Sequence, residues 1–345
     1  MVERGKIWSF SYLRSAACIA IIIIHTVYCA LLMYGSGLSQ TQTIATWAVN
    51  NCMMWAVPVF VMVTGALLLD TGRTLTYRKL FGRYIARILG ALVFFGVLFC
   101  VLDMISGGEE RSVRSFFGGF YEVFSGTSWS HLWYLYLLIG LYLLLPFYKK
   151  IAAASSEFDI KYLLLVSLLF LSLKPVLGIF GIECGFYIHV STIYPFFLFC
   201  GFAIHKGLLK IPPAAAGLSA LAGTAGIVIL TAVRWSKGME SLDLFFEYSS
   251  ILVVLQAVGI FALADGLVTG KGKALRWLME KIDGCSFGIY LVHMIFVRLI
   301  FKHTPLNPYE QGGVFCFIAM VLGFLAVSWI VVWVMKKIPG LRAIC

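Results

Sequence analysis

The stretch S11-Y-L-R-S-A-A-C-I-A-I-I-I-I-H-T-V-Y-C-A30 is apolar enough for a membrane-spanning helix, yet it contains Arg14 and His25. Eleven residues at about 100° each bring these two side chains within about 20° of one another around the helix axis. They lie about 16 Å apart along it. Ionisable side chains within membrane helices are costly and face a bundle interior or a water-filled cavity. The stretch therefore predicts a helix with a functional polar face.

The rest of the chain is equally apolar. Hydrophobic residues make up 61% and charged residues 12%, with a mean hydropathy of +0.94, whereas soluble domains carry about 25% charged residues. A bilayer core requires about 20 apolar residues per helix. The sequence therefore predicts an all-α, polytopic membrane protein with about ten spans in one domain, residues 1–345. The spans are expected at 11–34, 44–69, 80–103, 132–148, 162–181, 187–205, 212–233, 247–269, 285–301 and 313–335.

The distribution of basic residues predicts the orientation. The net charge is +11, and most Lys and Arg fall in the two terminal segments and in connections on the same side as these. By the positive-inside rule both termini are expected in the cytoplasm, with the chain in the cell (plasma or inner) membrane. Topology thus accounts for the basic excess, and nucleic-acid binding is not expected. The nine cysteines are scattered without a C-x-x-C pair, so neither a disulfide framework nor a metal site is expected.

The longest connection, 104–131, is expected outside. It contains S112-V-R-S-F-F-G-G-F-Y-E-V-F124, in which aromatic residues recur at helical spacing. This pattern favours a short amphipathic helix lying at the outer membrane interface. An ordinary packed loop is the alternative.

The chemistry of Arg14 and His25 suggests a division of labour. Arginine presents a rigid fork of donors that suits phosphate, and histidine suits general-base catalysis near neutral pH. A phosphate-bearing donor held at Arg14 could extend a reactive arm, such as pantetheine, inward to His25. The structural alternatives are that Arg14 anchors the helix at the headgroups and that His25 bonds a neighbouring helix.

With these residues the sequence resembles the acyltransferase-3 family of integral membrane O-acyltransferases. The spacing of Arg14 and His25 matches the family's first helix. Four further stretches resemble family segments in the same order: P58-V-F-V-M-V-T-G-A-L-L68, H131-L-W-Y-L135, Y194-P-F-F-L-F-C-G201 and S286-F-G-I-Y-L-V-H293. Together the matches cover nearly the whole chain.

The resemblance implies transfer of an acyl group, usually acetyl from acetyl-CoA, to a hydroxyl of a cell-envelope polysaccharide or lipid-linked sugar. The chain resembles the members that lack an appended extracytoplasmic domain. It departs from the family at the start of the third helix, where a compact Arg-x-x-Arg is replaced by R83-Y-I-A-R87. Arg83 and Arg87 still share a helical face, but their assignment to CoA phosphates is weakened.

A basic cluster at the start of that helix is a candidate donor-binding site. It could hold nucleotide phosphates beside Arg14, because clustered cations suit a polyanion. Topology alone would equally explain the cluster. Its members are Arg78, Lys79, Arg83 and Arg87.

Candidates for acceptor binding lie toward the outer side. His131, Trp133 and Tyr134 could bind a sugar through hydroxyl contacts and ring stacking, or could belong to the interfacial aromatic belt. Lys174 and Glu183 could line a polar acceptor cavity or, with Arg298, form a buried ion-pair network.

Tyr290 and His293 are expected at the depth of His25, one helical turn apart. They could stabilise a tetrahedral intermediate or form a structural bond between helices.

The sequence therefore predicts a membrane O-acetyltransferase with His25 as general base and Arg14 holding acetyl-CoA. Its expected partners are acetyl-CoA, a carbohydrate or glycolipid acceptor and membrane lipids, without a metal. A secondary transporter or flippase of a sugar-containing substrate is the main alternative, since it too would place His and Arg inside a bundle; a membrane sensor is another. The acceptor, its side of approach, the acyl length, an acyl-enzyme step and the oligomeric state are left open.

Overall fold

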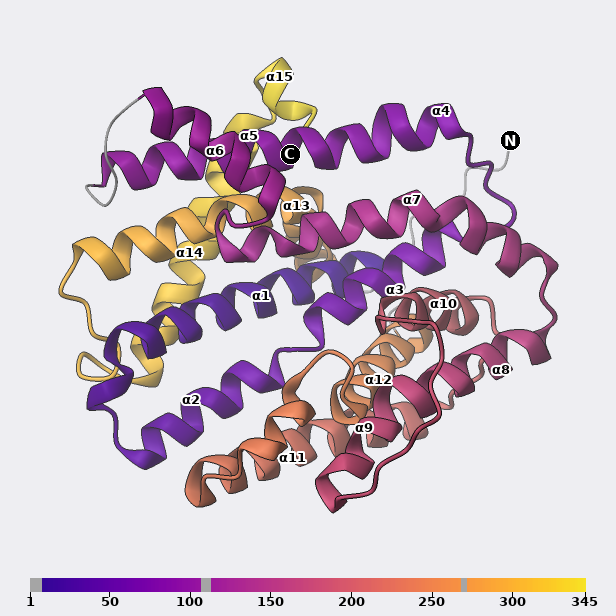
Figure 1. Ribbon diagram of the computed structural model, residues 1–345. Coiled ribbons are helices and arrows are strands. Elements are labelled where there is room, and N and C mark those ends of the chain that lie inside the picture. The colour runs from indigo at the N-terminus through magenta and orange to yellow at the C-terminus, as the bar shows by residue number, and fades with distance from the viewer. Residues whose placement is uncertain (1–7, 107–112, 268–271) are drawn as a thin grey trace.

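The computed structural model describes residues 8–106, 113–267 and 272–345 (Figure 1). These residues form helices and connecting turns, without a strand. Nine helical stretches in this part of the chain, some of which join consecutive helices as Gln40–Leu68 does, are long and apolar enough to cross a membrane, which confirms the predicted all-α, polytopic class. The α-helices are α1 (Trp8–Tyr34), α2 (Gln40–Cys52), α3 (Ala56–Leu68), α4 (Tyr77–Lys79), α5 (Ala86–Ile105), α6 (Val113–Ser125), α7 (Trp133–Ala154), α8 (Glu157–Leu168), α9 (Lys174–Leu177), α10 (Tyr194–His205), α11 (Pro213–Lys237), α12 (Ile251–Leu267), α13 (Lys273–His303), α14 (Val314–Met335) and α15 (Pro339–Arg342).

The span expected over 187–205 is wrong in its first part. Residues 182–193 are not helical, and α10 begins only at Tyr194. Pro195 lies in the first turn, where its missing N–H costs no helical hydrogen bond and its fixed φ suits the helix. The resulting helix has 12 residues, fewer than the roughly 20 that a bilayer crossing needs.

The span expected over 44–69 is divided in two. The chain turns at residues 53–55, between α2 and α3. The cause is Pro58, because a proline ring clashes with the carbonyl four residues earlier, here that of Met54. The break redirects α3 toward the centre of the bundle, where it lies against α1 and α10.

Two glycines bring α3 and α10 into backbone contact. A Cβ added to Gly65 would lie 1.8 Å from the carbonyl oxygen of Leu198, and one added to Gly201 would lie 2.1 Å from that of Met62. Small residues allow membrane helices to approach this closely. Both glycines lie in stretches that resemble family segments. The close packing of α3 and α10 is a physical reason for a glycine at each of these positions.

Helix α1 crosses the middle of the molecule (Figure 1). It packs against α13, α3, α14, α12 and α2. Phe10, Ile22 and Ala30 on this helix are fully buried. A helix enclosed on several sides by others explains how an arginine and a histidine can lie within it without facing lipid.

The predicted amphipathic helix is present as α6. Gly119 of this helix lies against the Cys100 side chain, and Val123 packs against Gly96 of α5. Phe117, Tyr121 and Phe124 are largely exposed. The helix itself is confirmed, whereas its location at the outer interface and the cytoplasmic location of the termini stay predictions.

Candidate active site

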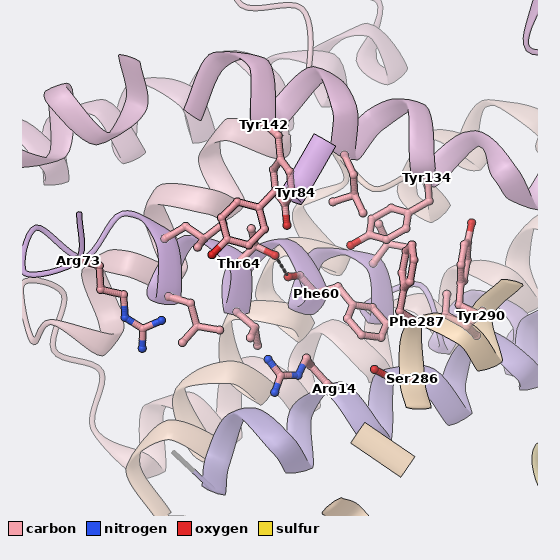
Figure 2. Close-up of a pocket in the computed structure, with 16 residues that line it drawn as sticks. Arg14, Phe60, Thr64, Arg73, Tyr84, Tyr134, Tyr142, Ser286, Phe287 and Tyr290 are labelled. Carbon is pink, nitrogen blue, oxygen red and sulfur yellow. Dashed lines mark hydrogen bonds between the residues drawn. The ribbon is translucent and has the colours of Figure 1, made fainter. Parts of the chain in front are cut away.

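A cavity of about 330 Å³ lies beside the Arg14 face of α1 (Figure 2). Its walls come from α1, α3, α7, α13 and a π-helical turn, Leu80–Ile85, that precedes α5. Arg73 lies toward one end, Tyr134 and Tyr290 lie toward the other, and Arg14 lies between them. Aliphatic side chains of α1, α3 and α7 form much of the remaining wall. The cavity thus suits an extended, largely uncharged molecule with an anionic end.

Arg14 is held by Asp283 of α13. The Arg14 Nε lies 2.6 Å from Asp283 Oδ1, and Nη2 lies 2.9 Å from Oδ2. The side chains are 30% and 10% exposed, respectively. This bidentate pair is net neutral, and Nη1 of Arg14 makes no hydrogen bond within the described part of the chain. Sequence reasoning did not name Asp283, although an acidic residue at the border of an apolar helix was a usable signal.

Three histidines from separate segments meet beyond the cavity. His25 Nδ1 lies 2.7 Å from His293 Nε2. The ring of His131, from the short turn Ser130–Leu132 before α7, lies 5.7 Å from that of His293 and 6.1 Å from that of His25. His131 and His293 are buried, and His25 is partly exposed. The sequence places His131 in an outer sugar site, separate from the other two; the structure instead brings its ring next to theirs.

The hydrogen bonds of His25 and His293 determine which ring nitrogen carries the proton when both imidazoles are neutral. His293 Nδ1 lies 3.1 Å from the carbonyl oxygen of Ile289, which can only accept a hydrogen bond. His293 Nδ1 therefore carries the proton, and its Nε2 accepts from His25 Nδ1–H. Consequently the lone pair of neutral His25 is on Nε2, which makes no hydrogen bond to a described residue. An imidazole oriented in this way is suited to remove a proton.

Tyr134 and Tyr290 lie between the cavity and the histidines. Both line the cavity, with ring centroids 5.6 Å apart. The Tyr290 hydroxyl donates to the backbone carbonyl of His131, and its ring is 6.1 Å from that of His293. His25 itself does not line the cavity.

An aromatic and charged cluster covers His131 away from the cavity. The His131 ring packs against Phe99 and Trp129, at 5.3 and 6.1 Å between centroids. Trp129 Nε1 donates to Asp103 Oδ2 at 2.6 Å. The guanidinium of Arg298 lies 4.0 Å from the Trp129 ring and 3.2 Å from Asp103. Neither ring nitrogen of His131 has a hydrogen bond of normal geometry, although the backbone of Leu291 lies close to the ring.

The predicted basic cluster is divided by the structure. Arg78 and Arg83 are exposed and line neither the cavity nor the adjoining one described next. Arg87 donates through Nη2 to the Cys345 carbonyl at 2.6 Å and lies over the Phe287 ring at 4.9 Å, outside the cavity. Lys79 lines the adjoining cavity.

A second cavity of about 290 Å³ adjoins the first, and Leu68, Arg73 and Tyr84 line both. Lys79 and the loop 72–75 provide the rest of its wall. Arg73 was not predicted as a site residue. Its position in a loop directly after α3 was the available signal, because binding residues often lie on loops held by a rigid scaffold.

The residues proposed for acceptor binding are dispersed. Trp133 is 38% exposed and lies beside Tyr194 and Tyr248, at 6.2 and 5.5 Å between ring centroids. Tyr134 is instead buried against the first cavity.

Among the described residues, no hydrogen bond or ring contact joins Lys174 or Glu183 to these rings. Lys174 donates to the Phe186 carbonyl, Glu183 is exposed, and among the described residues no ion pair joins the two. Arg298 pairs with Asp103. The buried network of Lys174, Glu183 and Arg298 is therefore not formed.

Comparison with known proteins gives one match. The model of the acyltransferase-3 family, described as an acyltransferase domain, matches residues 7–333. No curated protein and no solved structure matches the chain. Within the described residues, no group of three or more His, Cys, Asp or Glu could hold a metal ion.

Proposed function

Because the chain belongs to the acyltransferase-3 family and is a membrane acyltransferase, we propose that it transfers an acetyl group from acetyl-CoA to a hydroxyl of a cell-envelope carbohydrate or lipid-linked sugar. The observation that carries the proposal is the cavity that leads from Arg73 past Arg14 to the tyrosines beside three histidines (Figure 2). It provides a path for an extended donor, and its inner end is lined by Tyr290, whose ring lies 6.1 Å from that of His293, the partner of His25.

The proposed reaction begins at His25. Its Nε2 takes the proton of the acceptor hydroxyl while the oxygen attacks the thioester carbonyl. The tetrahedral intermediate collapses, the carbon–sulfur bond breaks, and the proton passes from His25 to the departing CoA thiolate. The Tyr290 hydroxyl, at the end of the cavity, is our candidate donor to the developing oxyanion. Because Tyr134 and Tyr290 separate the cavity from His25, the proposal includes a rotation of Tyr290 when substrates bind.

The acceptor is proposed to enter from the side opposite the donor cavity. Trp133, Tyr194 and Tyr248 form an aromatic cluster next to Tyr134, and aromatic rings of this kind suit a pyranose ring. The ring nitrogens of His131 have no hydrogen bond of normal geometry but are buried, so the proposal has them contact a sugar hydroxyl only after neighbouring side chains move. Acetyl would then cross the membrane without acetyl-CoA doing so.

A vesicle assay tests this function. Sealed vesicles containing the purified protein should transfer labelled acetyl from acetyl-CoA on one face to an impermeant oligosaccharide on the other. A vesicle with His25→Ala protein provides the background. Acetyl-CoA binding without transfer to any carbohydrate would exclude the proposed acceptor class, and absence of binding by folded protein would exclude the donor.

The bond from His293 to His25 leads to a separate prediction. His293→Leu should lower the transfer rate by about 10²-fold, since removing a partner that orients a catalytic or ligating histidine has effects of this order. His293→Gln should lose less, because its amide oxygen can still accept from His25 Nδ1–H. Transfer rates at saturating donor measure this, and equal losses in the two variants would contradict the orienting role.

A further inference from the structure

We propose that the donor site has two parts: Arg73 and Lys79 bind the nucleotide phosphates, and the neutral Arg14–Asp283 pair binds the uncharged pantetheine arm. This inference rests on the proposed function and revises the assignment of phosphate to Arg14. It concerns which residues of the protein bind the negatively charged part of the donor.

The first argument is the charge of the inner site. The fork of Arg14 is already occupied by both carboxylate oxygens of Asp283, at 2.6 and 2.9 Å. A phosphate placed there would compete with the carboxylate and lie close to its negative charge. The remaining donors on Nη1 suit a neutral acceptor, and a pantetheine arm carries amide carbonyls. The apolar walls around Arg14 suit the same uncharged arm.

The second argument is the composition of the outer cavity. Arg73 and Lys79 both line it, together with Thr74. Arg73 lines both cavities, so a donor that extends from one into the other passes this residue. A lysine and an arginine on the walls of one cavity can supply several charged donors to phosphate oxygens, and hydrogen bonds of this kind are strong.

The third argument is that the loop carrying Arg73 is held in place. Asp70 Oδ1 accepts from Lys206 Nζ at 2.7 Å and from the Gly72 N–H at 3.1 Å. Lys149 Nζ donates to the Leu68 and Asp70 carbonyls. These bonds fix the turn and reduce the ordering that ligand binding would require.

Calorimetry in detergent with two unreactive probes tests the division. CoA carries phosphates, whereas pantetheine, used as a competitor of CoA, carries none. Arg73→Gln and Lys79→Gln should each weaken CoA binding by at least about tenfold, as expected for lost hydrogen bonds to charged groups. Both should leave pantetheine binding unchanged. They should also reduce the salt dependence of CoA binding.

Arg14 variants should behave differently. Arg14→Gln could fail to fold because Asp283 would lose its partner, so the neutral double variant Arg14→Gln/Asp283→Asn is tested beside it. The double variant should bind both CoA and pantetheine more weakly than the wild type, by the same factor of roughly several-fold. The salt dependence of CoA binding should stay unchanged. Lys150→Gln, an exposed residue on α7 outside both cavities, is the matched control.

The outcomes separate this inference from the proposed function. Folded wild-type protein that binds no CoA would overturn the proposed function. If Arg83→Gln weakens the binding of CoA and Arg73→Gln does not, Arg83 binds the phosphates and Arg73 does not. That result would overturn the division. If the double variant loses the binding of CoA but keeps that of pantetheine, Arg14 binds the phosphates. That result would also overturn the division.

Discussion

His25→Ala is expected to lower the rate of acetyl transfer by about 10²–10⁴-fold, the range for removal of a general base, while acetyl-CoA binding stays nearly unchanged. The reason is the geometry of the three histidines. His25 is the member whose Nε2 is left with a free lone pair by the chain of hydrogen bonds through His293 and Ile289. It does not line the cavity proposed for the donor, so its removal should affect the reaction more than binding.

The measurement combines calorimetry with acetyl-CoA and single-turnover transfer to a carbohydrate acceptor. His303→Ala, an exposed histidine at the end of α13, is the matched control and should retain the wild-type rate. His25→Gln tests whether a hydrogen bond to His293 without a base suffices, and should be as slow as His25→Ala. A His25→Ala protein that keeps more than about a tenth of the wild-type rate would exclude general-base catalysis by this residue.

Gly201→Ala is expected to prevent stable folding or to lower stability by roughly 2–3 kcal/mol or more, at or above the usual range for overpacking. The added methyl would lie 2.1 Å from the Met62 carbonyl oxygen. Backbone cannot rotate away as a side chain can, so α3 and α10 must separate. Gly65→Ala should have the same effect, because its Cβ would meet the Leu198 carbonyl.

Thermal melting monitored by size-exclusion chromatography in detergent measures this effect. Gly140→Ala on α7 is the control, since a Cβ added there would meet no neighbouring atom within 4 Å, and it should melt like the wild type. Should Gly201→Ala and Gly140→Ala melt at the same temperature, the close contact of α3 and α10 would be wrong.

Several features of the fold were accessible to sequence reasoning, including two that were missed. The aromatic spacing over 112–124 correctly indicated the helix α6. Pro195 and Pro58 marked the late start of α10 and the division between α2 and α3, but their helix-breaking effect was outweighed by the apolar character of the surrounding residues. Hydropathy measures whether a segment can enter a membrane, and does not by itself locate the helix ends.

The order of residues is enough to infer that the chain is helical and crosses a membrane, that it resembles acyltransferases, and that Arg14 and His25 share one face of α1. These properties are local, because hydropathy, helical period and motif spacing depend on neighbouring residues. The partners of these residues depend on how the helices pack: Asp283 for Arg14, His293 and His131 for His25, and Arg73 in place of Arg83 and Arg87 at the cavity wall. Arg14 and Asp283 are 269 residues apart, and their pairing follows from how α1 packs on α13, which no local pattern records.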